Sequence, residues 1–217
     1  MKNWEFTGET QTFLGIKLKR IRATATFKLK CGIEIKSGQL GGWLEKETNL
    51  DGDAWVYGDA WVYGNAQVSG NAQVYGDARV YGNAQVSGDA WVSGDAWVSG
   101  NAQVYGDAQV YGDAWVSGDA RVSGNAQVSG NAQVYGNAQV SGNAQVVTIG
   151  RVGSRNETTT FFLCNDKQIR VVCGCFYGTL DEFREKVKET HGDNKHAKVY
   201  LLAADLAEAQ IEIPDVL

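Results

Sequence analysis

The chain has 217 residues, of which 43% are hydrophobic, 27 are glycine and one is proline, and its formal net charge is -5. This length and apolar content suit one or two domains with a buried core and exclude wholesale disorder. Because no apolar run approaches a membrane span and the N-terminus lacks the pattern of a secretory signal, we expect a cytoplasmic protein without membrane contacts. The four cysteines are sparse and unevenly placed, which is typical of reduced thiols.

Residues 1–50 are predicted to form an N-terminal β cap domain. Apolar and polar residues alternate between positions 4 and 36, most clearly in 16–22 and 27–30, which indicates a small antiparallel sheet. The lysines and arginines of these strands could attract nucleic acid. A solvated strand face is the commoner interpretation, and because no base-stacking module is present we expect no nucleic-acid partner. Trp43 and Leu44 are expected to plug the open end of the domain that follows.

Residues 51–148 are dominated by one repeat. From Asp53 to Thr148 the chain consists of sixteen copies of a six-residue unit, Asp/Asn-Ala-X-Val-Tyr/Ser-Gly, without an insertion. In a short strand, Ala and Val would point to one face and X and Tyr/Ser to the other. The glycine and the following Asp or Asn supply a corner, because both tolerate left-handed backbone angles. The repeat therefore predicts a parallel β-helix with an aliphatic interior.

This hexapeptide resembles the repeat of left-handed parallel β-helix proteins, in which three units make one triangular coil. The resemblance implies left-handed coils, and sixteen units would form a little over five of them, a prism roughly 25 Å long. The expected fold is thus mainly β: a left-handed parallel β-helix with an N-terminal β cap and a C-terminal ββαα domain.

Residues 18 apart would stack in such a coil, which sorts the X positions onto three faces. All five tryptophans of the array lie on the first two faces, and Arg79 is placed between Trp61 and Trp97, a geometry suited to cation–π contact. Aromatic residues at this density form a larger apolar patch than monomers usually expose. We therefore expect a homo-oligomer, and the resemblance favours a trimer. The predicted oligomer or partner surface consists of Trp55, Trp61, Trp91, Trp97, Trp115 and Arg79.

Four aspartates of the array, Asp59, Asp77, Asp95 and Asp113, would form one vertical row. Like charges at this spacing repel unless they are solvated or bridged by cations. Aspartates that only set the corners are the simpler interpretation, because asparagine fills the same slot elsewhere. A calcium ladder is the alternative. We expect no metal and no cofactor.

Residues 149–217 are predicted to form the C-terminal ββαα domain. Two alternating segments around Asn165–Lys167 indicate a β-hairpin. Thr179 and Glu182 form a capping box that begins a helix, and Gly192 ends it. The expected elements are strands over 158–164 and 168–173, a helix through about Thr190 and a helix over about 195–210.

The loop before the first of these strands offers hydroxyls, amides and a cation, as a phosphate or nucleotide site would. An ordinary turn is the alternative interpretation. The predicted ligand-binding residues are Ser154, Arg155, Asn156, Thr158, Thr160 and His191. Cys173 and Cys175 would place two thiols on one side of a strand. Because no second cysteine pair stands at metal spacing, we expect no zinc there.

Uncharacterised bacteriophage and prophage proteins are similar to this chain over nearly its whole length. The similarity is carried by the array and by the segments FLGIKLKRIRA, SGQLGGWLEKETNL, GSRNETTTFF, CGCFYGTLDEF and THGDNKHAKVY. It implies a phage origin and this three-part layout, and it brings no established catalytic residues. Hexapeptide acyltransferases resemble the coil motif too, but they use a histidine on the coils as a general base. Because the array contains no histidine and no interrupting loop, we expect no enzyme.

The leading hypothesis is a non-catalytic, homo-oligomeric phage protein that acts as a binding or scaffold module. In its specific version the protein is an antagonist of host defence in the host cytoplasm, which sequesters a nucleotide-like ligand or binds a host protein. Arg155 and its neighbouring hydroxyls would then contact phosphate. The main alternative is a virion tail or fibre component whose rigid rod is the function, and a relative of the acyltransferases is a less favoured one.

Overall fold

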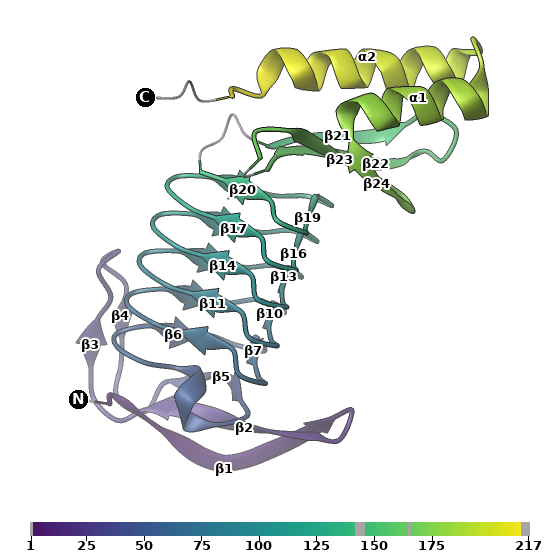
Figure 1. The fold of residues 1–217 in the computed structure, drawn as a ribbon. Helices are drawn as coiled ribbons and strands as arrows, with labels where there is room; N and C mark the ends of the chain where they lie inside the picture. The colour runs from purple at the N-terminus through teal and green to yellow at the C-terminus, as the bar shows by residue number, and fades with distance from the viewer. Residues whose placement is uncertain (1, 142–145, 165, 214–217) are drawn as a thin grey trace.

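The structure, a computed structural model, describes residues 2–141, 146–164 and 166–213. Three parts follow one another along a rod: a cap of antiparallel strands, a parallel β-solenoid and a domain made of a sheet and two helices (Figure 1). The predicted fold, a mainly β chain with a parallel β-helix between a β cap and a C-terminal domain, is confirmed. Within the described ranges, no helix has the length and hydropathy needed to cross a bilayer.

The solenoid has three faces, because each six-residue unit contributes one two-residue strand and one corner. Strands 18 residues apart pair in parallel, so that Arg79 is in register with Trp61 and with Trp97. The first face comprises β6 (Trp55–Val56), β9 (Gln73–Val74), β12 (Trp91–Val92), β15 (Gln109–Val110) and β18 (Gln127–Val128). The second face comprises β7 (Trp61–Val62), β10 (Arg79–Val80), β13 (Trp97–Val98), β16 (Trp115–Val116) and β19 (Gln133–Val134). The third face comprises β8 (Gln67–Val68), β11 (Gln85–Val86), β14 (Gln103–Val104), β17 (Arg121–Val122) and β20 (Gln139–Val140).

The interior of the solenoid is a continuous aliphatic column. Every repeat alanine from Ala54 to Ala138 and every repeat valine from Val56 to Val140 is buried. These residues stand two apart in each unit, so one side of each short strand faces inward. Burial of one valine side chain stabilises the fold by roughly 1.5–3 kcal/mol, and the same contribution recurs along the rod. The predicted sorting of residues onto faces is confirmed.

The cap consists of two hairpins and a strand that joins the solenoid. Its elements are β1 (Trp4–Phe13), β2 (Ile16–Ala23), β3 (Phe27–Lys28), β4 (Glu34–Ile35), β5 (Leu40–Leu44) and the 3-10 helix η1 (Glu47–Asn49). The predicted antiparallel sheet is confirmed, since β1 pairs with β2 and β2 pairs with β5. β5 also runs parallel to β7, so the cap sheet continues directly into the second face.

Trp43 and Leu44 add a rung to the solenoid instead of plugging its end. Trp43 lies opposite Trp61 and Leu44 lies opposite Val62, in the positions that X and Val fill in a regular unit. A Cβ added at Gly42 would lie 2.6 Å from the carbonyl oxygen of Ala60, so this close approach requires glycine. Three other cap residues, Ile21, Leu29 and Ile35, are buried and belong to the same hydrophobic core as the column.

The C-terminal domain has four strands and two helices. They are β21 (Val146–Val152), β22 (Glu157–Leu163), β23 (Ile169–Cys173), β24 (Phe176–Thr179), α1 (Leu180–His191) and α2 (Lys195–Gln210). The predicted hairpin is confirmed as β22 and β23, and both helices and the Thr179 capping box are confirmed. The domain is ββββαα and not ββαα, because β21 and β24 flank that hairpin. Val146–Thr148, predicted as the end of the array, belong to β21; residues 143–145 of that last unit and Asn165 of the predicted turn lie outside the described residues.

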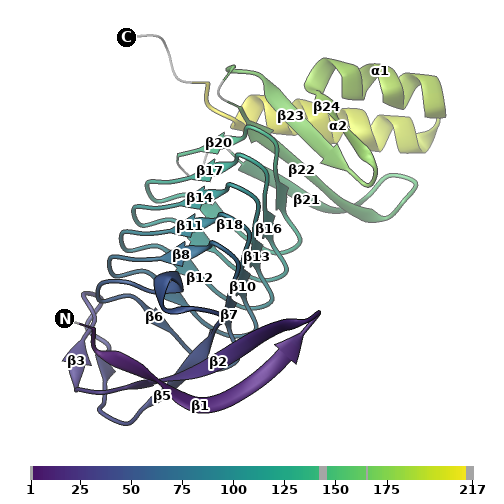
Figure 2. The ribbon, with the colours of Figure 1, turned by 60° about the horizontal axis from the view of Figure 1, so that its bottom comes forward.

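The four-stranded sheet is buried on both faces. Phe162, Cys164 and Val172 pack onto the end of the solenoid core, whereas Phe161 and Val171 pack against the helices. In Figure 2 the sheet separates the last coils from α1 and α2. Burial on both faces explains why the end of β22, Phe161–Leu163, is a continuous apolar run without alternation. The sheet thus closes the second end of the column.

Candidate functional site

The loop between β21 and β22 packs tightly against α2. Gly153 has φ +68°, and a Cβ added there would lie 1.8 Å from ring atom Cζ of Tyr200. Only glycine therefore allows the loop to rest on this ring. The contact places the next two residues, Ser154 and Arg155, at the space between the sheet and the helices.

This space is a pocket of about 370 Å³, which we call the helix-side pocket. Its polar residues include Ser154, Arg155, Lys186 and His191, and its aromatic wall consists of Phe176, Phe183 and Tyr200. The rings support one another, with centroids 5.4 Å apart for Phe176–Phe183 and 5.8 Å apart for Phe183–Tyr200. Cationic and hydrogen-bonding groups beside an aromatic wall suit a ligand that has an anionic group and a planar part.

Arg155 is held in place by its neighbours. Its Nε lies 3.0 Å from Oε2 of Glu157, and this hydrogen bond raises the pKa of Arg155. The guanidinium lies close to the turn between β23 and β24, where a Cβ added at Gly174 would be 2.6 Å from Nε. An anionic ligand would therefore meet a positioned guanidinium, in competition with the Glu157 carboxylate.

Ser154 and His191 meet across the pocket. Ser154 Oγ lies 3.4 Å from His191 Nε2, and the imidazole stacks on the Tyr200 ring at 5.6 Å. A nucleophile and its general base are usually within about 2.6–3.2 Å of one another, with a third group that orients the base. The observed contact is longer, and the support of the imidazole is an aromatic ring. The pair suits hydrogen bonding to a ligand better than nucleophilic attack.

The six predicted ligand-binding residues do not form one site. Ser154, Arg155 and His191 line the helix-side pocket, whereas Asn156 and Thr158 line a separate pocket of about 690 Å³ against the last coils. The division falls at Asn156, the last residue of the turn between β21 and β22, whose left-handed φ of 53° changes the direction of the chain.

Thr160 lines neither of these two pockets. It is buried, and its Oγ1 accepts a hydrogen bond of 3.1 Å from the backbone amide of Gln133, which fastens the sheet to the solenoid. Its neighbour Thr159 is also buried and donates to Cys173 Sγ at 3.3 Å. Cys175 stands in the exposed turn after Cys173, and both cysteines line the helix-side pocket. Within the described ranges, no group of three or more His, Cys, Asp or Glu residues is arranged to hold a metal ion.

Lys186, Phe176 and Tyr200 are pocket residues that the sequence patterns did not predict. Phe183, Val187 and Thr190 stand four and three residues apart, and this spacing could have shown that one side of α1 faces a common surface. Nothing local in the sequence indicates that α2 brings Tyr200 across to the same place.

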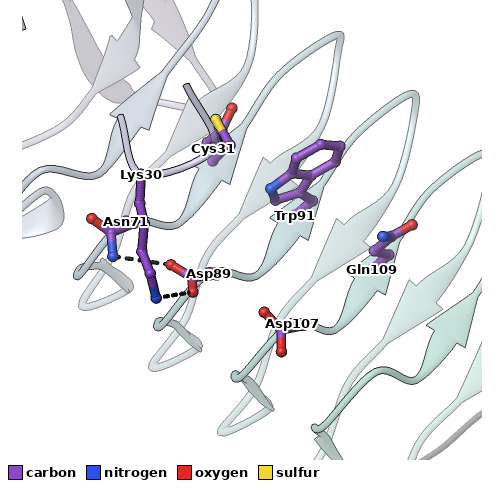
Figure 3. A pocket seen from close by; sticks show the side chains of 8 residues that line it. Lys30, Cys31, Asn71, Asp89, Trp91, Asp107 and Gln109 are labelled. Atoms are coloured by element: carbon purple, nitrogen blue, oxygen red, sulfur yellow. Dashed lines mark hydrogen bonds and ion pairs between the residues drawn. The ribbon is translucent and has the colours of Figure 1, made fainter. Parts of the chain in front are cut away.

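A second candidate lies at the cap, in a groove of about 290 Å³ between Lys30–Cys31 and the first face of the solenoid (Figure 3). Lys30 Nζ contacts Asp89 Oδ2 at 2.6 Å, and Asn71 Nδ2 donates to Asp89 Oδ1 at 3.0 Å. The Lys30–Asp89 hydrogen bond raises the pKa of Lys30 and lowers that of Asp89. Because these charged groups already pair with one another, we interpret the contact as one that holds the β3–β4 hairpin against the first face of the solenoid.

The predicted partner surface is smaller in the structure. Trp55 is 0% exposed and packs against Phe27 of the β3–β4 hairpin, which removes it from that surface. Arg79 does lie between two tryptophans, 4.6 Å from the ring centre of Trp61 and 5.1 Å from that of Trp97, but Phe13 covers one side of it.

Beyond Arg79, the aromatic side chains of the second face continue with Trp97, whose ring stacks on that of Trp115 with centroids 4.9 Å apart. Trp115 is 47% exposed, and Trp91 on the first face is half-buried. Trimer formation along these faces stays a prediction.

Comparison with known proteins concerns the solenoid alone. A family model described as the YdcK beta solenoid repeat matches residues 72–86, 84–100, 102–118, 114–130, 126–142 and 132–148. No curated protein matches the chain in sequence. The matched segments begin at residue 72, after the first coil, and lie within the solenoid except for 146–148, which belong to β21. The central part of the chain is therefore a repeat β-helix similar to the YdcK beta solenoid.

Proposed function

We propose that this chain is a non-catalytic binding module whose helix-side pocket holds a planar, anionic, nucleotide-like ligand. The observation that supports the proposal is the convergence of Ser154, Arg155, Lys186 and His191 on one aromatic-walled pocket. Phosphate oxygens accept well-directed hydrogen bonds from a guanidinium, and a flat ring system packs favourably on aromatic side chains. The solenoid then acts as a stiff spacer between this pocket and the cap.

The specific version of the proposal concerns a phage setting. There, a module that binds a nucleotide signal of host defence without turning it over would lower the free concentration of that signal. Such a role needs a tight site and no general base, which agrees with the long Ser154–His191 contact of 3.4 Å.

Isothermal titration against a panel of cyclic and ADP-ribose-type nucleotides tests the proposal. We expect one ligand of this class to bind, and Arg155→Ala to weaken its affinity at least roughly tenfold, since a hydrogen bond to a charged group contributes about 1.5–3 kcal/mol. Glu157→Gln should bind as tightly as wild type or more tightly, because it removes the carboxylate that competes for Arg155.

Arg151→Ala is the matched control. Arg151 lies in the same hairpin but lines the pocket against the last coils, and its replacement removes the same charge. Affinity that survives Arg151→Ala and is lost in Arg155→Ala locates the ligand in the helix-side pocket. The proposal is rejected if wild type binds none of these nucleotides or if Arg155→Ala binds as well as wild type.

A further inference from the structure

Helix α2 is apolar on both sides. Its inner side carries small residues, Ala197, Ala203, Ala204 and Ala207, together with Tyr200, and all of them are buried. Its outer side carries three larger ones, since Val199 is 40%, Leu202 is 68% and Leu206 is 55% exposed. A surface helix normally shows the reverse order, with large apolar residues inward and polar ones outward.

The three outer residues form one stripe. Their spacing of three and four residues places them on the same side of the helix. Figure 1 shows α2 beyond the sheet, with no other described element over its outer side. Contiguous exposed apolar residues mark an interaction surface, whereas scattered single ones are common on soluble proteins.

We propose that this stripe pairs with the same stripe of a second copy of the chain, with the two α2 helices antiparallel. The charges beside the stripe support this occupant: Lys195 and Lys198 stand at the N-terminal end of α2, and Glu212 follows its C-terminal end. Asp205 and Glu208 are held by Arg184 of α1 and are not counted here. In an antiparallel pair each lysine end faces an acidic end, and the helix dipoles are opposed favourably. A parallel pair would bring lysine against lysine.

The pairing is a two-fold contact in which one surface patch meets itself. Leu202 of one copy would pack near Leu206 of the other at the centre, and Lys198 would reach Glu212 at each end. α2 spans about 24 Å, so the interface is small and the association should be reversible and dependent on protein concentration. The inference does not depend on the ligand proposed for the helix-side pocket, because that pocket uses the opposite side of α2.

Sedimentation velocity over a range of protein concentrations tests the pairing. Wild type should show a reversible doubling of mass as concentration rises. The double variant Leu202→Glu/Leu206→Glu should raise the dissociation constant at least roughly tenfold, because two charges would be buried against apolar side chains. Circular dichroism should match wild type, since both positions are exposed in the isolated chain. Solenoid faces are unchanged in this variant, so association through them would persist.

A charge exchange distinguishes antiparallel pairing of the helices from parallel pairing. Lys198→Glu and Glu212→Lys should each weaken self-association, because each places like charges opposite one another at both ends. An equimolar mixture of the two variants restores both opposite-charge pairs and should associate as wild type does. The inference is overturned if wild type shows no doubling, if the leucine variant doubles as readily as wild type, or if the mixture associates no better than the separate variants.

Discussion

Tyr57 carries a polar group that the fold leaves without a partner. Its hydroxyl is buried, and no hydrogen-bond partner stands within reach among the described residues. Its ring packs against Trp55 and Tyr75 on the first face of the solenoid. Burial raises the pKa of Tyr57 to about 12, because the phenolate would lose its hydration. Tyr57 is thus a place where removing a polar atom should improve the fold.

We predict that Tyr57→Phe raises the free energy of unfolding by about 1 kcal/mol, since a buried donor without a partner costs about 1–3 kcal/mol. The advantage should grow between pH 10 and the folded pKa of about 12. In that range the unfolded chain releases the phenolic proton while the folded chain keeps it, so wild-type stability falls with rising pH and the variant lacks this contribution.

Urea unfolding at pH 7 and at several alkaline values measures both effects. Tyr105→Phe is the control, because Tyr105 is exposed and its replacement should change little. A Tyr57→Phe variant that is less stable than wild type would show that the hydroxyl has a partner.

The same kind of residue has different roles at equivalent positions of the repeat. Trp55 and Trp115 both occupy the X position, yet one is buried and the other is 47% exposed. The spacing predicts which face each side chain lies on, because that depends on the local period. It does not predict what covers the face, because Phe27 reaches Trp55 from another part of the chain. The division of Arg155 and Asn156 between two pockets was missed for the same reason.

At the scale of elements, one row of corner residues forms a hydrogen-bond ladder from coil to coil. This ladder explains where Asn and where Asp occurs in the row. Lys46 Nζ donates to Asn65, whose side-chain amide donates to Asn83, which donates to Asn101, which donates to Asp119. Asparagine both donates and accepts, so it can continue such a ladder, whereas aspartate can only end it. The interpretation that these residues only set corners is therefore incomplete for this row.

The corner glycines stack closely from coil to coil. Gly94 has φ +68°, and a Cβ added there would lie 3.0 Å from the amide nitrogen of Gly112. Gly58 has φ +55°, but a Cβ there would meet nothing within 4 Å. The two positions separate backbone strain from crowding between coils.

We predict that Gly58→Ala costs about 1–2 kcal/mol of stability, the strain of a left-handed alanine. Gly94→Ala should cost about 1–3 kcal/mol more, because its methyl group presses on the next coil. Thermal unfolding followed by circular dichroism compares the two variants. Equal losses would mean that the coils move apart at no cost.

Element boundaries could be predicted where a local signal fixes them. The Thr179 capping box and Gly192 set the ends of α1, and both are local features. The start of β21 was missed because Val146–Thr148 complete the last six-residue unit in sequence. In the structure these residues pair with β22 and so belong to the C-terminal sheet. Long-range pairing of this kind leaves no mark in a short window of sequence.

At the scale of the whole molecule, the rod is stable because both ends of its aliphatic column are covered. Ile21 of the cap packs at one end, beside Gly41 and Val56, and Phe162 and Val172 of the C-terminal sheet pack at the other. An uncovered end would expose its last ring of valines to water. Apart from the first coils, which Phe13, Phe27 and Lys30 of the cap contact, the coils touch only their neighbours, so their number can vary. Because three units make a coil, a change of 18 residues preserves every face and a change of six does not.

Two exposed cysteines allow the spacing and the relative rotation of the two ends of the rod to be measured. Cys31 lies at the cap and Cys175 lies in the C-terminal domain, whereas Cys164 and Cys173 are buried. Burial raises the pKa of Cys164 to about 11, which keeps its thiol protonated and unreactive at neutral pH. Spin labels should therefore attach at the two ends of the rod.

Deletion of residues 101–118 removes one coil, and we predict a folded protein in which the labels approach by about 4.8 Å along the axis, the spacing of one strand pair. Deletion of residues 113–118 alone should also fold, but it turns the C-terminal domain by a third of a turn relative to the cap and so changes the label distance by a different amount. Double electron–electron resonance, on labelled protein diluted with unlabelled protein, reads both distances within one chain. The prediction is wrong if the variant that lacks residues 101–118 does not fold, or if both variants give the same label distance. Either result would show that the coils are not interchangeable units that each add one full turn.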